Sequence, residues 1–115
     1  MKSDQKKFSI IDEGFTVEGM VVGKGRLVIK GTVKGSVNGE NVVIAEEGSV
    51  YAEAKANSMT IGGLFDGQIE VDKELIILST GKCSGKVTCN DLVVEAGGSL
   101  NAEVTCKRHH TKEVN

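Results

Sequence analysis

Proline is absent from the 115-residue chain, although the chain contains 15 glycines. That absence excludes the flexible Pro/Gly/Ser composition of a disordered linker. The glycine content lies well above the average usage of about 7%, so these glycines are expected to serve an ordered fold. A chain of this length has room for a single domain.

A net field of one sign is also missing, as is any long apolar run. The 14 basic and 16 acidic residues give a formal charge of -2, which excludes the concentrated basic surface of a nucleic-acid-binding protein. The longest apolar runs, such as residues 75–78, are far shorter than the roughly 20 residues that span a bilayer.

Residues 1–10 contain lysines without a following apolar segment, so no secretory signal is predicted. Three cysteines, an odd number, favour reduced thiols in the cytoplasm.

An apolar pattern repeats six times along the chain. Each unit has three apolar positions, and the second and third are always four residues apart. The eighteen positions are Ile11, Val17, Val21, Ile29, Val33, Val37, Ile44, Val50, Ala54, Ile61, Phe65, Ile69, Ile77, Cys83, Val87, Val94, Leu100 and Val104. Successive units start 15 to 18 residues apart. This period predicts an all-β, single-stranded β-helix, a solenoid of six rungs with a triangular cross-section and three inward columns.

Small residues between the second and third columns support this interpretation, because a chain corner tolerates only a small side chain. They are Gly19, Gly35, Ala52, Gly67, Gly85 and Ala102. A further apolar residue lies two positions before the first column in five units and therefore points to the same side of a strand. These residues are Leu27, Val42, Met59, Leu75 and Leu92. No stretch sustains the apolar spacing of a helix, and a β-sandwich would show hairpin turns instead.

The repeat predicts a β-helix domain over residues 11–106, between flexible tails at residues 1–10 and 107–115. Neither tail has enough apolar residues to cap an end, although monomeric repeat proteins cap theirs. Each end should then expose unpaired backbone groups and an apolar triangle. Stacking of such ends does not close on itself and yields filaments, whereas a monomer with frayed ends is the alternative. The expected polymer interface consists of Ile11, Val17 and Val21 at one end and Val94, Leu100 and Val104 at the other.

Residues 27–37 (LVIKGTVKGSV), 59–69 (MTIGGLFDGQI) and 75–87 (LIILSTGKCSGKV) resemble the repeated pattern of the bactofilin family. The resemblance covers about residues 10–106. It implies a right-handed β-helix, a property that periodicity alone does not set. It also implies polymerisation with itself, without nucleotide, into cytoskeletal filaments that serve cell shape, envelope growth or the positioning of envelope-synthesis proteins. Family members often have longer tails that contain proline, and this chain departs from them in having none, which weakens any expectation of partners bound through the tails.

Some bactofilins attach to the inner membrane through a short N-terminal segment. In this chain the residues that would contact an anionic membrane surface are Lys2, Lys6, Lys7 and Phe8. Each basic residue would contribute about 1 kcal/mol there, and a filament would add avidity. The resemblance thus implies a cytoplasmic protein that is peripheral at the inner membrane if this contact forms, and the alternative is a polar tail without a contact.

No cofactor is expected, although one cysteine and histidine group was considered as a metal site. The glycines of residues 23–25 and 62–63 lack the arrangement of a phosphate-binding loop. Cys89 and Cys106 lie 17 residues apart, one rung, within reach of a disulfide, but a reducing compartment favours core thiols. With His109 and His110 they could hold zinc, but their spacing matches no recognised finger. Cys83, in the second column, is interpreted as a packing residue.

An enzyme is the alternative from another class. A hexapeptide-type acyltransferase would need an aliphatic residue every six positions and a catalytic histidine. Here spacings of six are interrupted by spacings of four and seven, both histidines fall in the C-terminal tail, and no rung has a long insertion. We therefore expect a structural protein without catalytic residues, and binding of an envelope enzyme along its side would be compatible with this role.

Overall fold

The computed structural model describes the backbone of residues 8–112 and the side chains of residues 9–105. This part of the chain forms strands and no helix, and it contains no segment that could cross a membrane as a helix. The strands are β1 (Phe8–Ile11), β2 (Thr16–Val22), β3 (Arg26–Ile29), β4 (Thr32–Asn38), β5 (Asn41–Ile44), β6 (Ser49–Ile61), β7 (Leu64–Ile77), β8 (Lys82–Glu95) and β9 (Ser99–Lys112).

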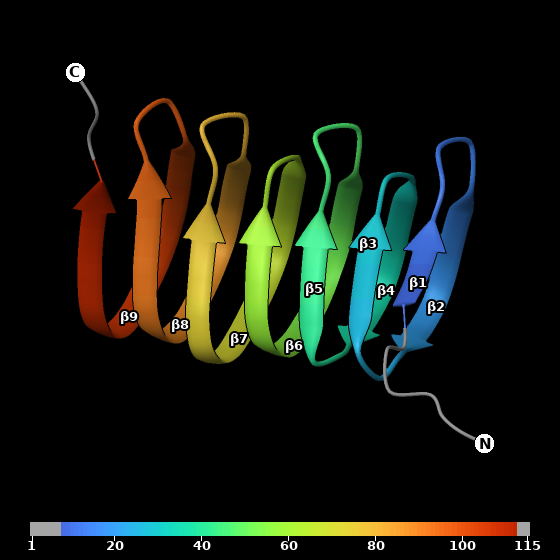
Figure 1. Ribbon diagram of the computed structural model, residues 1–115, viewed down its shortest axis with the longest axis horizontal. Helices are drawn as coiled ribbons and strands as arrows, with labels where there is room; N and C mark the ends of the chain where they lie inside the picture. The colour runs from blue at the N-terminus through green and yellow to red at the C-terminus, as the bar shows by residue number, and fades with distance from the viewer. Residues whose placement is uncertain (1–7, 113–115) are drawn as a thin grey trace.

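The strands coil into a right-handed β-solenoid of about six turns. Every strand pairs in parallel with the strand one turn away, in the order β1-β3-β5-β6-β7-β8-β9 on one side and β2-β4-β6 on another. In Figure 1 the nearer strands run upward, the chain turns over to the more distant strands, and each turn advances to the left. That sense of rotation is right-handed, as the family resemblance implies.

The register confirms all three predicted columns. The first aligns Ile11, Ile29, Ile44, Ile61, Ile77 and Val94. The second aligns Val17, Val33, Val50, Phe65, Cys83 and Leu100, and the third aligns Val21, Val37, Ala54, Ile69, Val87 and Val104. The extra apolar residues Leu27, Val42, Met59, Leu75 and Leu92 form a fourth inward row. Columns in such alignment bury apolar side chains continuously along the axis, which is what stabilises rungs that could not fold alone.

Burial follows position along the solenoid. The column residues of the four inner rungs are nearly inaccessible to solvent, as at Ile29, Ile44 and Phe65, all 0% exposed. No polar or charged residue is buried among the side chains described. Dispersion and burial of apolar area therefore hold the inner rungs together.

The corner between the second and third columns requires close approach of neighbouring rungs. Gly35 has a φ of +127°, which side chains rarely adopt, and a Cβ built there would overlap the carbonyl oxygen of Gly19 on the preceding rung. Ala52 occupies the next position in the same row. The row therefore needs a small residue at every rung, and it needs glycine only at rungs where φ is positive. The expected role of small residues at this corner is confirmed.

The strands extend beyond the predicted domain of residues 11–106. β1 begins at Phe8, and β9 continues to Lys112. Residues 108–112 pair in register with residues 91–95 of β8. They lack the apolar alternation that marks the other rungs, so backbone pairing with the preceding strand is what continues the ladder there.

Candidate assembly interface

The N-terminal end of the solenoid is formed by β1 and β2. Among the described residues, β1 pairs only with β3 and β2 only with β4, so one edge of each strand has no partner. Ile11, Val17 and Val21 pack against the core from this edge and are half-buried, unlike the inner members of their columns. The structure thus leaves an apolar triangle and unpaired backbone groups at this end.

Exposed apolar side chains concentrate on the same rung. The exposed fractions are 50% for Ile10, 63% for Phe15, 74% for Met20 and 67% for Val22, and among the described side chains the one other large hydrophobic residue that is exposed is Tyr51. These four residues lie at outward positions or in the turn between β1 and β2. Sequence reasoning missed them because it followed the inward columns, although the apolar neighbours of Ile11 and Val21 were a visible signal. The first rung is therefore apolar on both its inner and outer sides.

The C-terminal end is formed by β9. Leu100 and Val104 lie on this last strand and are half-buried against the core. Val94 lies on β8 instead, and its register partner on β9 is Thr111. Of the three residues expected at this edge, the structure thus places two on the terminal strand and Val94 one layer further in.

Of the four residues considered as a zinc site, the structure describes the side chain of Cys89 alone. Cys89 is disulfide-bonded, which corrects the expectation of a reduced thiol and removes this sulfur as a thiolate ligand. Its register partner is Cys106, while His109 and His110 align with Leu92 and Val93.

The side chains of Cys106, His109 and His110 lie outside the described residues. No group of three or more metal-ligating side chains occurs among those that are described.

Cys83 is a free thiol in the second column, 1% exposed, between Phe65 and Leu100 in register. Burial raises its pKa to about 12, with a further contribution from the negative charge of Asp66. The thiol is therefore neutral near pH 7 and packs as a small apolar side chain. Its interpretation as a packing residue agrees with this environment.

The residues expected to contact a membrane are not placed by the structure. Lys2, Lys6 and Lys7 lie outside the described residues, and of Phe8 only the backbone, at the start of β1, is described.

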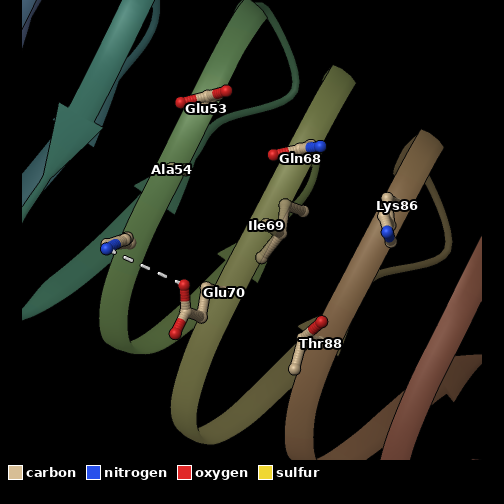
Figure 2. A pocket seen from close by; sticks show the side chains of 8 residues that line it. Glu53, Ala54, Gln68, Ile69, Glu70, Lys86 and Thr88 are labelled. Atoms are coloured by element: carbon tan, nitrogen blue, oxygen red, sulfur yellow. Dashed lines mark ion pairs between the residues drawn. The ribbon is translucent and has the colours of Figure 1, made fainter.

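The side of the solenoid carries an open, shallow depression of about 210 Å³ on β6, β7 and β8. Figure 2 shows Glu53, Gln68 and Lys86 side by side on successive rungs, and its dashed line marks the ion pair of Glu70 with Lys55. Lys55 Nζ and Glu70 Oε1 are 3.9 Å apart, and both side chains are more than half exposed, so their ion pair contributes little. The depression presents charged and amide groups to solvent and does not enclose a ligand.

Comparison with known proteins gives one match. A family model described as "Bactofilin: Polymer-forming cytoskeletal" matches residues 9–105. Searches of curated proteins and of solved structures found no match. The matched range includes the inner rungs and the column residues at both ends of the solenoid, and it stops within β9.

Proposed function

Because the chain belongs to the bactofilin family of polymer-forming cytoskeletal proteins, we propose that its β-helices join end to end through their terminal rungs into a filament. The interface is made by Ile11, Val17 and Val21 at the N-terminal end and by Leu100 and Val104 at the C-terminal end. Val94 supports this second edge from one layer inside. Assembly needs no nucleotide, because the contact is a continuation of the fold itself.

The observation that carries this proposal is the contrast in burial along each column. Inner column residues such as Val33 and Val50 are 0% exposed, whereas the members at both ends are half-buried. A neighbour stacked at strand spacing would bury the terminal members as the inner ones already are. It would also pair the free backbone edges of β2 and β9, and each such hydrogen bond contributes about 1 kcal/mol.

In the cell, we place the filament in the cytoplasm, where it supports cell shape or positions envelope-synthesis proteins. Lys2, Lys6, Lys7 and Phe8 would hold it at the anionic inner surface of the membrane. Three lysines and one phenylalanine would bind one copy weakly, whereas a polymer would bind firmly because it presents many copies. Loss of cosedimentation with anionic vesicles on changing the three lysines to glutamine tests this part.

A structural role suits the surface of the solenoid better than catalysis does. The family is cytoskeletal, and the charged side chains of the lateral depression lie open to solvent. A hexapeptide-type acyltransferase, the alternative function, would require a histidine in a cleft between rungs. Both histidines occur instead at the C-terminal edge, on β9.

Negative-stain microscopy of purified protein at micromolar concentration tests end-to-end assembly. The Val17→Lys and Leu100→Lys variants each place a charge in a terminal triangle, and both are expected to abolish filaments because a stacked neighbour would have to desolvate that charge. Glu18→Lys is the matched control, since Glu18 is an exposed neighbour of Val17 on the same strand. Filaments from the terminal variants, or loss of filaments from the control alone, would contradict the proposal.

A further inference from the structure

One outer side of the solenoid carries a largely apolar row from the first rung to the sixth. This side is formed by β1, β3 and β5 and by the C-terminal segments of β6, β7 and β8, the nearer strands in Figure 1. Six outward residues, one from each strand, align in register and all are β-branched. This outer ridge consists of Ile10, Val28, Val43, Thr60, Ile76 and Val93.

The composition of the outer ridge differs from that of the other outward rows. The row that passes through Glu53 continues with Gln68 and Lys86, and the row beside it contains Lys55 and Glu70. These residues are exposed and keep their sides of the solenoid solvated. The ridge residues beyond Ile10 are half-buried by their own neighbours yet still reach the surface. Solubility alone therefore does not account for a row with aliphatic residues on five of its six rungs.

The face around the outer ridge is shaped for packing against a second sheet. Its strands β1, β3 and β5 are short and pair without a register shift. A row of β-branched side chains on such a pleated surface can interdigitate with another row when two sheets pack about 10 Å apart. Arg26, Glu74 and Asp91 flank the row on one side. An apolar centre with a charged margin is the usual arrangement of a protein interface.

The size of this face indicates what covers it. Four-residue strands and six rungs give an area of roughly 13 by 29 Å, or about 380 Å². A stable contact between two separate proteins buries about 800 Å² on each partner. Two isolated copies would therefore not remain paired through this face. Because the ridge reaches from the first rung to the sixth, stacking end to end would extend it along the whole filament and multiply the contact with each added copy.

We propose that the outer ridge is the lateral contact by which two filaments of this chain pair side by side. The occupant of the face is thus a second copy of the chain within a second filament. This inference rests on the proposed end-to-end assembly, and it adds a second, distinct interface to it.

The test compares the width of filaments formed by wild-type protein and by a ridge variant in negative-stain microscopy. A single solenoid measures 29 by 25 Å across its axis, and a pair doubles one of these dimensions. The variant Val43→Lys with Ile76→Lys places two charges in the ridge, and the control Glu53→Lys with Gln68→Lys places two on another side. We expect paired filaments from wild type and control but single filaments from the ridge variant.

Each other outcome has a defined meaning. Paired filaments from the ridge variant, or single filaments from wild type at all concentrations, overturn lateral pairing and leave end-to-end assembly intact. Absence of any wild-type filament overturns the proposed function and this inference together. If the lysine variant fails to fold by circular dichroism, Val43→Thr with Ile76→Thr replaces it, because Thr60 already occupies this row. That milder variant is expected to pair only at higher protein concentration than wild type, and unchanged pairing would overturn the inference.

Discussion

Gly19 and Gly35 occupy equivalent positions on adjacent rungs, and replacing each by alanine separates folding from assembly. The two glycines are register partners with φ values of +120° and +127°. A Cβ at Gly35 would overlap the carbonyl oxygen of Gly19, whereas a Cβ at Gly19 meets nothing within 4 Å among the described residues. Backbone strain is thus common to both variants, and the clash with a preceding rung belongs to Gly35→Ala alone.

The expected free-energy costs follow from this difference. A side chain held in a sparsely populated backbone region costs about 1–3 kcal/mol, and this is the full expected loss for Gly19→Ala. In Gly35→Ala the two rungs must also separate locally, which weakens several ladder hydrogen bonds worth about 1 kcal/mol each. We expect Gly35→Ala to lose at least about 2 kcal/mol more than Gly19→Ala in the free energy of unfolding.

Gly19→Ala should cost less than Gly35→Ala in folding, but it should disrupt assembly. Its Cβ would protrude from the N-terminal end into the junction with a stacked neighbour, so the folded variant should fail to form filaments. Urea unfolding of dispersed protein measures the first effect, and sedimentation of concentrated protein measures the second. Equal unfolding costs for the two variants, or sedimentation of Gly19→Ala at the wild-type concentration, would refute the reasoning.

Three further predictions concern stability. Phe65→Ala should lower the free energy of unfolding by about 3–5 kcal/mol because this side chain is 0% exposed. Phe15→Ala should lower it by less than about 0.5 kcal/mol because Phe15 is 63% exposed. Similar urea midpoints for the two variants would contradict the column assignment. Because the pKa of Cys83 is raised, the protonated thiol contributes to the free energy of unfolding. This contribution is complete below the ordinary thiol pKa near 9 and is lost as the pH rises toward about 12. The advantage of wild type over Cys83→Ala should therefore shrink across that range by up to about 4 kcal/mol, and a constant difference in alkaline unfolding experiments would refute a buried thiol. Lys55→Ala should change the unfolding free energy by less than about 1 kcal/mol because its ion pair with Glu70 is exposed; a larger loss on thermal unfolding would show that the pair is structural.

The columns could be predicted from the sequence because burial on three sides of a solenoid imposes a strict spacing. Val17 and Leu100, at opposite ends, follow the same four-residue interval as Phe65 at the centre, and the register confirms it. The end of the fold could not be predicted in the same way. Residues 108–112 join β9 by backbone pairing, and hydrogen bonds of the main chain leave no signature in the side chains.

The candidate interface was predicted in part. Spacing located its inward apolar residues, but Val94 was taken as terminal because the added strand opposite it, at Thr111, was unforeseen. For Cys89 the spacing of one rung allowed either a thiol or a disulfide, and the choice rested on the expected compartment and not on geometry. The disulfide found there shows that the expected compartment was the wrong guide. The outer ridge was overlooked because apolar residues were sought only at inward positions.

Fibre diffraction from aligned filaments tests end-to-end stacking most directly. If the solenoid axis runs along the filament, the rungs repeat along it and the strand spacing of about 4.8 Å gives a reflection on the meridian. The same reflection on the equator would mean that the rungs stack perpendicular to the filament axis, and it would contradict assembly through the terminal strands.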